Sequence, residues 1–232
     1  MSEHLTEEEQ IEAFKRWWNQ YGTLTIGAVV VAAGAYFGHG AWESSKVKQA
    51  QANSALYDQL VTVATTSEGE LTDKQAEALK AAANEVIAAK SSGLYEDLAR
   101  LQLAKVAVEQ DDLAAAREAL TEVVNNTKVP ATRELANLRL ARVLAAESKY
   151  DEALAIVSAT PSEPFAAAFA EVKGDIYHAQ GQLDQAYTAY ESAVSALGEQ
   201  SQGMRANILK FKMDNVRVAT ASPLAVSTEA AE

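Results

Sequence analysis

The chain contains no cysteine. That absence excludes disulfide bonds, thiolate metal sites and cysteine nucleophiles, and it is compatible with either the cytoplasm or an oxidising compartment. Proline occupies only 4 of the 232 positions and glycine only 11. Alternating segments rich in Val, Ile and Thr, which would indicate strands, are also nearly missing. The sequence therefore argues against a disulfide-rich scaffold and against a β-sheet protein.

Positive charge is scarce as well. The chain has 20 Lys and Arg against 32 Asp and Glu, which gives a formal net charge of −12. A polyanion repels the phosphates of nucleic acids, so no nucleic-acid partner is expected. The same charge repels an anionic lipid surface, and any attachment to membrane lipid must therefore be hydrophobic.

Alanine, glutamate, leucine and lysine fill most of the positions that these absences leave. Such side chains lose little rotamer freedom in a helix, so a composition of this kind favours helices. Hydrophobic residues make up 48% of the chain, which fits a folded protein. We therefore predict an all-α protein.

An apolar stretch at residues 21–42 is the strongest single feature. No Asp, Glu, Lys or Arg occurs from Trp17 to Trp42. Twenty-two helical residues are about 33 Å long, enough for a hydrocarbon core of about 30 Å. Aromatic residues crowd both ends of the stretch, where a membrane meets water. The pattern predicts a single transmembrane helix at 21–42.

The stretch has two alternative interpretations besides a retained membrane helix. A cleaved signal peptide would have a basic start and a shorter apolar run, whereas MSEHLTEEEQIEAFKR contains five glutamates, one lysine and one arginine. A buried helix of a soluble protein stays open because glycine and alanine supply ten of the 22 residues. The transmembrane interpretation is preferred over both.

Charges beside the stretch bear on its orientation. Lys15 and Arg16 precede it closely, and Lys46 and Lys48 follow at a slightly greater distance. Because basic residues stay on the cytoplasmic side, the sequence favours a cytoplasmic N-terminal segment at 1–20, with residues 43–218 on the other side.

Gly27, Gly34 and Gly38 share one helix face. They form a candidate contact face for another membrane helix, although glycine is simply common in such helices.

Residues 43–218 contain internal repeats. LQLAKVAVEQDDL, from Leu101, resembles LRLARVLAAESKY, which begins 37 residues later. A third unit places Gly174 and Tyr177 on one helix and Ala186 and Tyr190 on the next. Small residues at this spacing let two helices cross closely, and the tyrosines fill the gaps. Ala116 and Ala153 hold the place of Ala186 in the first two units. The pattern is similar to a tetratricopeptide repeat and predicts an α-solenoid.

Both ends of this domain carry further expectations. We expect Asp73 to cap an early helix and the pair Asp111-Asp112 to cap the helix after the first repeat turn. A last amphipathic helix from Gly203 should close the stack, with Ile208, Phe211 and Val216 available for packing. Residues 219–232 lack an apolar face and are predicted to be a disordered tail.

No motif for catalysis was found. The three histidines, His4, His39 and His178, have no partner at metal-ligand spacing, and the common nucleophile and phosphate-binding motifs do not occur. The sequence therefore predicts no enzyme, no cofactor and no metal site, although an unrecognised catalytic site stays an alternative.

The first helices of the repeats carry three candidate partner contacts, Arg100, Arg139 and Lys173. The alternative is that they are ordinary solvated charges.

The whole pattern resembles the YfgM family of ancillary SecYEG translocon subunits. The resemblance rests on EEEQIEAFKRWWNQYG at 7–22, on the glycine-rich span ending in HGAW, and on LRLARV at 138–143. It implies a single-span protein of the bacterial inner membrane with a periplasmic repeat domain. It also implies two partners, the SecYEG translocon and a membrane-anchored periplasmic chaperone of the prolyl-isomerase-like type. A tethered regulator of a stress-response factor, acting through the N-terminal segment, is the alternative function.

Overall fold

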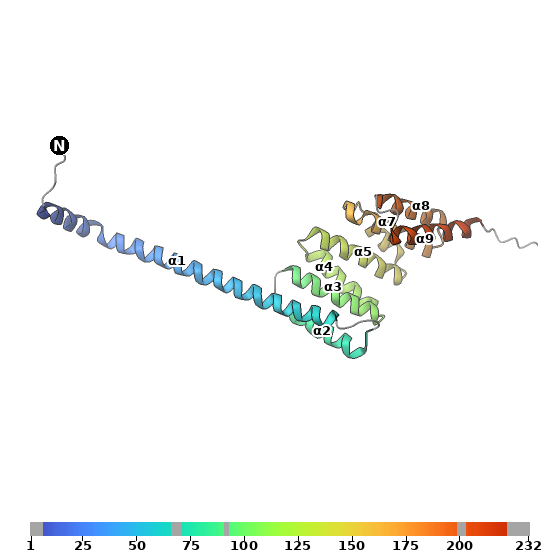
Figure 1. Cartoon of the computed structure of the whole chain (residues 1–232), viewed down its shortest axis with the longest axis horizontal. Helices are drawn as coiled ribbons and strands as arrows, with labels where there is room; N and C mark the ends of the chain where they lie inside the picture. The colour runs from blue at the N-terminus through green and yellow to red at the C-terminus, as the bar shows by residue number, and fades with distance from the viewer. Residues whose placement is uncertain (1–6, 66–70, 91–92, 199–202, 222–232) are drawn as a thin grey trace, which may run out of the picture. The chain divides into compact units, whose positions relative to one another are not determined.

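A computed structural model describes residues 7–65, 71–90, 93–198 and 203–221, and every regular element in these ranges is a helix (Figure 1). The helices are α1 (Glu7–Thr65), α2 (Asp73–Ala88), α3 (Gly93–Glu109), α4 (Leu113–Asn126), α5 (Pro130–Ala146), α6 (Tyr150–Val157), α7 (Glu163–Ala179), α8 (Leu183–Ala196) and α9 (Met204–Ala221). The predicted all-α class is confirmed. The helix α9 includes residues 219–221, and the remainder of the expected tail lies outside the described residues.

The chain divides into two compact units, Met1–Ala52 and Asn53–Glu232, and the boundary falls within α1. In the first unit, α1 is long and apolar enough to cross a membrane, and none of its most apolar window is buried. Leu24 is 74% exposed, Val29 is 62% exposed and Val30 is 64% exposed, and these three residues point in different directions around the helix. A helix with apolar side chains exposed on every face is typical of a membrane span rather than a soluble core.

In the second unit, from α2 to α9, helices that follow one another in sequence pack side by side; Figure 1 labels all of them except α6. One apolar cluster joins the end of α1 to α2 and α3 around Leu60. A larger cluster runs from α3 to α7 around Leu120. A third cluster joins α8 to α9 around Leu209. The core is therefore spread along the stack, as expected for a solenoid.

Two short turns show how the sequence starts its helices. Asp112 caps α4, because its side chain accepts a hydrogen bond from the backbone N–H of Ala115 at 3.0 Å. The prediction for α2 was wrong by one residue: Thr72, not Asp73, is the cap, and Gln75 completes a reciprocal capping box. A threonine followed three residues later by glutamine satisfies two backbone donors at once, whereas Asp73 lies in the first turn.

Small residues lie where the paired helices cross, as the repeat pattern predicts. Ala116, Ala153 and Ala186 are all completely buried. The closest approach is at Gly174 on α7, where an added Cβ would stand 2.5 Å from the ring of Tyr190 on α8. The hydroxyl of Tyr190 donates a hydrogen bond to Asp175 at 2.8 Å, which holds the ring against the glycine.

Gly174→Ala is therefore expected to destabilise the repeat domain by about 1–3 kcal/mol, the usual effect of overpacking, despite alanine's better helix propensity. Gly93→Ala is the matched control, because no atom lies within 4 Å of its added Cβ. Thermal unfolding followed by circular dichroism would compare the two variants. Equal melting temperatures would contradict the close crossing of α7 and α8.

The last helix, α9, packs through a different face from the one predicted. Leu209 is fully buried and Val216 is 1% exposed, whereas Ile208 is 48% exposed and Phe211 is 66% exposed. The expected packing of Val216 is confirmed, and that of Ile208 and Phe211 is wrong. Both faces of α9 are apolar, so the sequence alone does not determine which of them meets α8.

Candidate functional site

The three predicted partner contacts lie in three separate surface grooves of the repeat domain. Arg100 lines a groove formed by α2, α3 and α4. Arg139 lines a second groove formed by α3, α4 and α5. Lys173 lines a third, between α7 and α8. The structure does not bring the three residues together into one site, and the three grooves differ in their lining.

In the first groove, the charge of Arg100 is already partnered. Its guanidinium lies 3.4 Å from the carboxylate of Glu96, one turn earlier on the same helix. Both side chains are about three-quarters shielded from solvent, with 22% and 25% exposed. The walls also carry Glu118 and Glu122, so this groove offers no excess of positive charge.

The groove between α7 and α8 is larger, with a volume of about 510 Å³. Its walls mix apolar side chains with polar ones from α8, among them Asp184, Gln185 and Thr188. The Lys173 ammonium lies 6.0 Å from the centre of the Tyr177 ring, at the outer limit of a cation–π contact. Neither apolar side chains nor charge of one sign dominates the lining of this groove.

The groove of α3, α4 and α5 differs because its floor is apolar and its rim is basic. It has a volume of about 300 Å³. Its apolar lining residues are Ala104, Val108, Leu113, Leu120, Val143 and Ala146. The rim carries Lys105, Glu109, Arg139 and Arg142.

Arg139 and Arg142 are three residues apart on α5, so they share one helix face. Partial burial, and secondly the neighbouring charge of Arg142, lower the pKa of Arg139. Sequence reasoning did not select Arg142. Its signal was present in LRLARV, where two arginines at helical spacing flank small and apolar residues.

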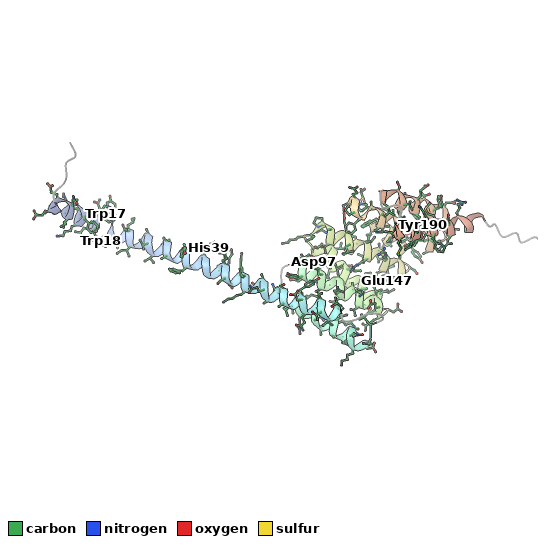
Figure 2. The ribbon with its side chains drawn as sticks, viewed as in Figure 1. Trp17, Trp18, His39, Asp97, Glu147 and Tyr190 are labelled. Carbon is green, nitrogen blue, oxygen red and sulfur yellow. The ribbon has the colours of Figure 1, made fainter. Side chains whose placement is uncertain are left out.

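Acidic side chains in and near this groove already have basic partners. Glu109 lies 3.6 Å from Lys105. Glu147, which follows α5, accepts hydrogen bonds from Lys149 at 3.0 Å and from Arg117 at 3.0 Å. The bond from Lys149 and the charge of Arg117 hold the pKa of Glu147 below its ordinary value. Figure 2 labels Glu147 in this part of the repeat domain.

A second charged cluster fixes α9 against α7. The Lys212 ammonium donates to Glu171 at 2.9 Å and to Asp175 at 2.7 Å, and Arg205 donates to Glu171 at 3.3 Å. Burial alone would raise the pKa of Glu171, but the two cations outweigh burial and lower it. Burial alone would lower the pKa of Lys212, but its two carboxylate partners raise it. Every charge here has a partner, so the cluster serves the fold.

These pKa shifts predict that the attachment of α9 to α7 weakens in acid. Because the folded pKa of Glu171 lies below its ordinary 4.5, the stabilisation is complete above pH 4.5 and is lost as the pH falls through the lowered value. We expect a loss of about 1–2 kcal/mol, between the values for exposed and buried ion pairs. Amide hydrogen exchange of α9 at decreasing pH would measure it. Glu171→Gln should exchange faster at pH 7 and show a smaller change with acid; an unchanged acid response would contradict this role.

In the first unit, α1 displays the predicted glycine face only in part. No atom lies within 4 Å of a Cβ added at Gly27 or at Gly34, so both positions are open to a second helix. The surroundings of Gly38 lie outside what the structure describes. Trp17 and Trp18 stand near the start of α1, and His39 lies farther along it (Figure 2). The contact face itself stays a prediction.

The part of the chain that the structure describes holds no group of three or more His, Asp or Glu that could bind a metal. His39 lies 3.8 Å from Glu43 and is otherwise exposed, and His4 lies outside the described residues. The expectation of a non-catalytic protein stays a prediction on these observations, and the groove of α3, α4 and α5 is the surface feature with the clearest chemical character.

Comparison with known proteins gives a consistent result. Residues 15–218 match the family model of the tetratricopeptide repeat-like domain. An ancillary SecYEG translocon subunit of Escherichia coli is 31% identical over 84% of this chain and 91% of that protein. Proteins of the same name from Haemophilus influenzae and Neisseria gonorrhoeae are 28% and 26% identical, over 93% and 94% of this chain and the whole of each relative. The comparison with solved structures gives no match.

Proposed function

Because this chain belongs to the family of ancillary SecYEG translocon subunits, we propose that it is a membrane-anchored adaptor of the SecYEG translocon. The single observation that carries the proposal is coverage. The relatives match over 91–100% of their own length, so the apolar helix and the repeat domain are shared as one arrangement. An adaptor needs both an anchor and a binding surface, and this chain offers each.

The anchor in this proposal is the apolar part of α1, residues 21–42. Its exposed apolar side chains and its lack of charge suit a lipid environment. We place the N-terminal segment in the cytoplasm, because Lys15 and Arg16 lie nearer to the span than Lys46 and Lys48 do. The repeat domain then works on the periplasmic side of the inner membrane.

The binding surface is the stack of helix pairs. A solenoid presents extended grooves that suit protein segments, and three such grooves are present here. We propose that the domain passes emerging chains to periplasmic folding factors, including a membrane-anchored chaperone of the prolyl-isomerase-like type. In this role the chain holds its partners close together and catalyses no reaction.

Affinity purification of the tagged chain from mild detergent extracts tests the proposal. SecYEG subunits should copurify with the intact chain, and photo-crosslinkers placed along α1 and along the groove of α3, α4 and α5 should trap neighbours in intact cells. A preparation free of translocon subunits, together with crosslinks to unrelated proteins only, would reject the function. If deletion of residues 1–16 alone abolished activity, the tethered-regulator alternative would be favoured.

A further inference from the structure

The basic rim of the groove of α3, α4 and α5 is anomalous in this chain. The net charge of the protein is −12, yet Arg139 and Arg142 stand together at the edge of an apolar cleft. Among the described residues, neither guanidinium has a carboxylate within salt-bridge distance. Other arginines of the repeat domain, such as Arg100, Arg117 and Arg205, are paired.

Two like charges one turn apart on a helix repel each other and destabilise it slightly. Through their charges alone, the two arginines therefore do not stabilise the fold. The neighbouring acids do not relieve the repulsion, because Glu109 is paired with Lys105 and Glu147 with Arg117 and Lys149. An anion from outside the chain would relieve the repulsion between the two guanidinium groups.

The floor adds a second requirement to any ligand. Leu113 and Val143 contribute apolar walls, and Val108 is 46% exposed although it lies within a largely apolar cleft. Covering this surface would remove apolar area from water, which is favourable at about 25 cal/mol per Å². The cleft and the rim together therefore select a ligand that is both acidic and apolar.

We propose that this groove binds an acidic, amphipathic segment of a partner protein, with a carboxylate between Arg139 and Arg142 and apolar side chains on the floor below. The proposal deepens the adaptor function and rests on it for the existence of a protein partner. Arginine suits the role because its planar fork can hold a carboxylate with two parallel hydrogen bonds.

A protein segment fits better than other anions. Nucleic acid and anionic lipid both present extended arrays of negative charge, which the −12 charge of the whole chain repels. A peptide brings only a few carboxylates, and the apolar face of an amphipathic helix can lie in a narrow cleft between helices. A volume of about 300 Å³ is at the lower end of the range for binding pockets.

The test uses the full chain in nanodiscs of neutral lipid and a short fluorescein-labelled helical peptide that carries leucines on one face and glutamates beside them. Fluorescence anisotropy should show saturable binding. A peptide with glutamine in place of every glutamate, and one with serine in place of every leucine, should each bind at least about tenfold more weakly, a difference of about 1.4 kcal/mol.

Two kinds of variant separate the rim from the floor. Arg139→Gln with Arg142→Gln should weaken binding of the glutamate peptide at least about tenfold and leave the weak binding of the glutamine peptide unchanged. Ala146→Phe should block the cleft while both arginines remain. Lys74→Gln with Lys128→Gln is the matched control, because it removes two exposed positive charges that line none of the three grooves.

Three results would overturn the proposal: full binding by the double arginine variant, equal weakening by the lysine control, or arginine-dependent binding of phosphatidylglycerol vesicles without peptide binding. The adaptor function is tested separately by copurification of SecYEG with the same variants. If SecYEG copurifies and the peptide does not bind, the groove assignment fails alone. If SecYEG is absent from the intact chain, the function fails whatever the peptide does.

Discussion

Placing two arginines in the middle of the apolar stretch, as Val30→Arg with Val31→Arg, is expected to release the chain from the membrane. Each arginine at the centre of a membrane helix opposes insertion by roughly 2.5–3.5 kcal/mol. Val30 is 64% exposed and Val31 is 71% exposed, so neither substitution removes packing within the protein. The repeat domain should stay folded, and the protein should shift from the membrane pellet to the soluble fraction after alkaline extraction.

Val47→Arg with Ala50→Arg is the control, because both residues are exposed on the same helix beyond residue 42. This variant should remain in the membrane. Retention of the Val30 and Val31 variant would show that the anchor lies elsewhere. Mass spectrometry of the mature chain adds a second criterion, because a chain that began after residue 42 would support the signal-peptide alternative and exclude an anchor.

Features that depend on local periodicity could be predicted from the sequence. The apolar stretch is defined by a run without charge, and the repeats by small residues that recur at equivalent places, so neither needs knowledge of distant contacts. Ala116, Ala153 and Ala186 illustrate this: their spacing alone indicates helix crossings, and all three are completely buried. Gly174 and Tyr190 form the predicted small-to-large contact.

Features that depend on which helix covers which face could not be predicted. Arg100 and Arg139 were predicted together as partner contacts, yet one is paired with Glu96 and the other borders an apolar groove. With the 37-residue repeat shift the two arginines differ by two positions, and the groove beside Arg139 depends on how α3 and α4 pack against α5. Arg142 escaped notice for the same reason, since its position beside the cleft is fixed by α3 and α4.

The rotation of α9 is the clearest case. Ile208 and Phe211 form one apolar face, and Leu209 and Val216 form another, so the helical period permits either to pack. Two observations explain the outcome. Ala206 is fully buried and allows close approach, and in the observed rotation Arg205 and Lys212 form ion pairs with Glu171 and Asp175 on α7.

Leu209→Ala is therefore expected to destabilise the end of the repeat domain by about 2–5 kcal/mol, the usual effect of truncating a buried leucine. Ile208→Ala, its neighbour on the same helix, should change stability by about 0.5 kcal/mol or less, because its side chain is half exposed. Amide hydrogen exchange is the suitable measurement, since a solenoid can unfold from its end. Leu209→Ala should raise exchange in α8 and α9 and leave α2 and α3 protected. The reverse ranking of the two variants would mean that Ile208 and Phe211 face α8, as the sequence suggested, and that the ion pairs of Lys212 do not set the rotation of the helix.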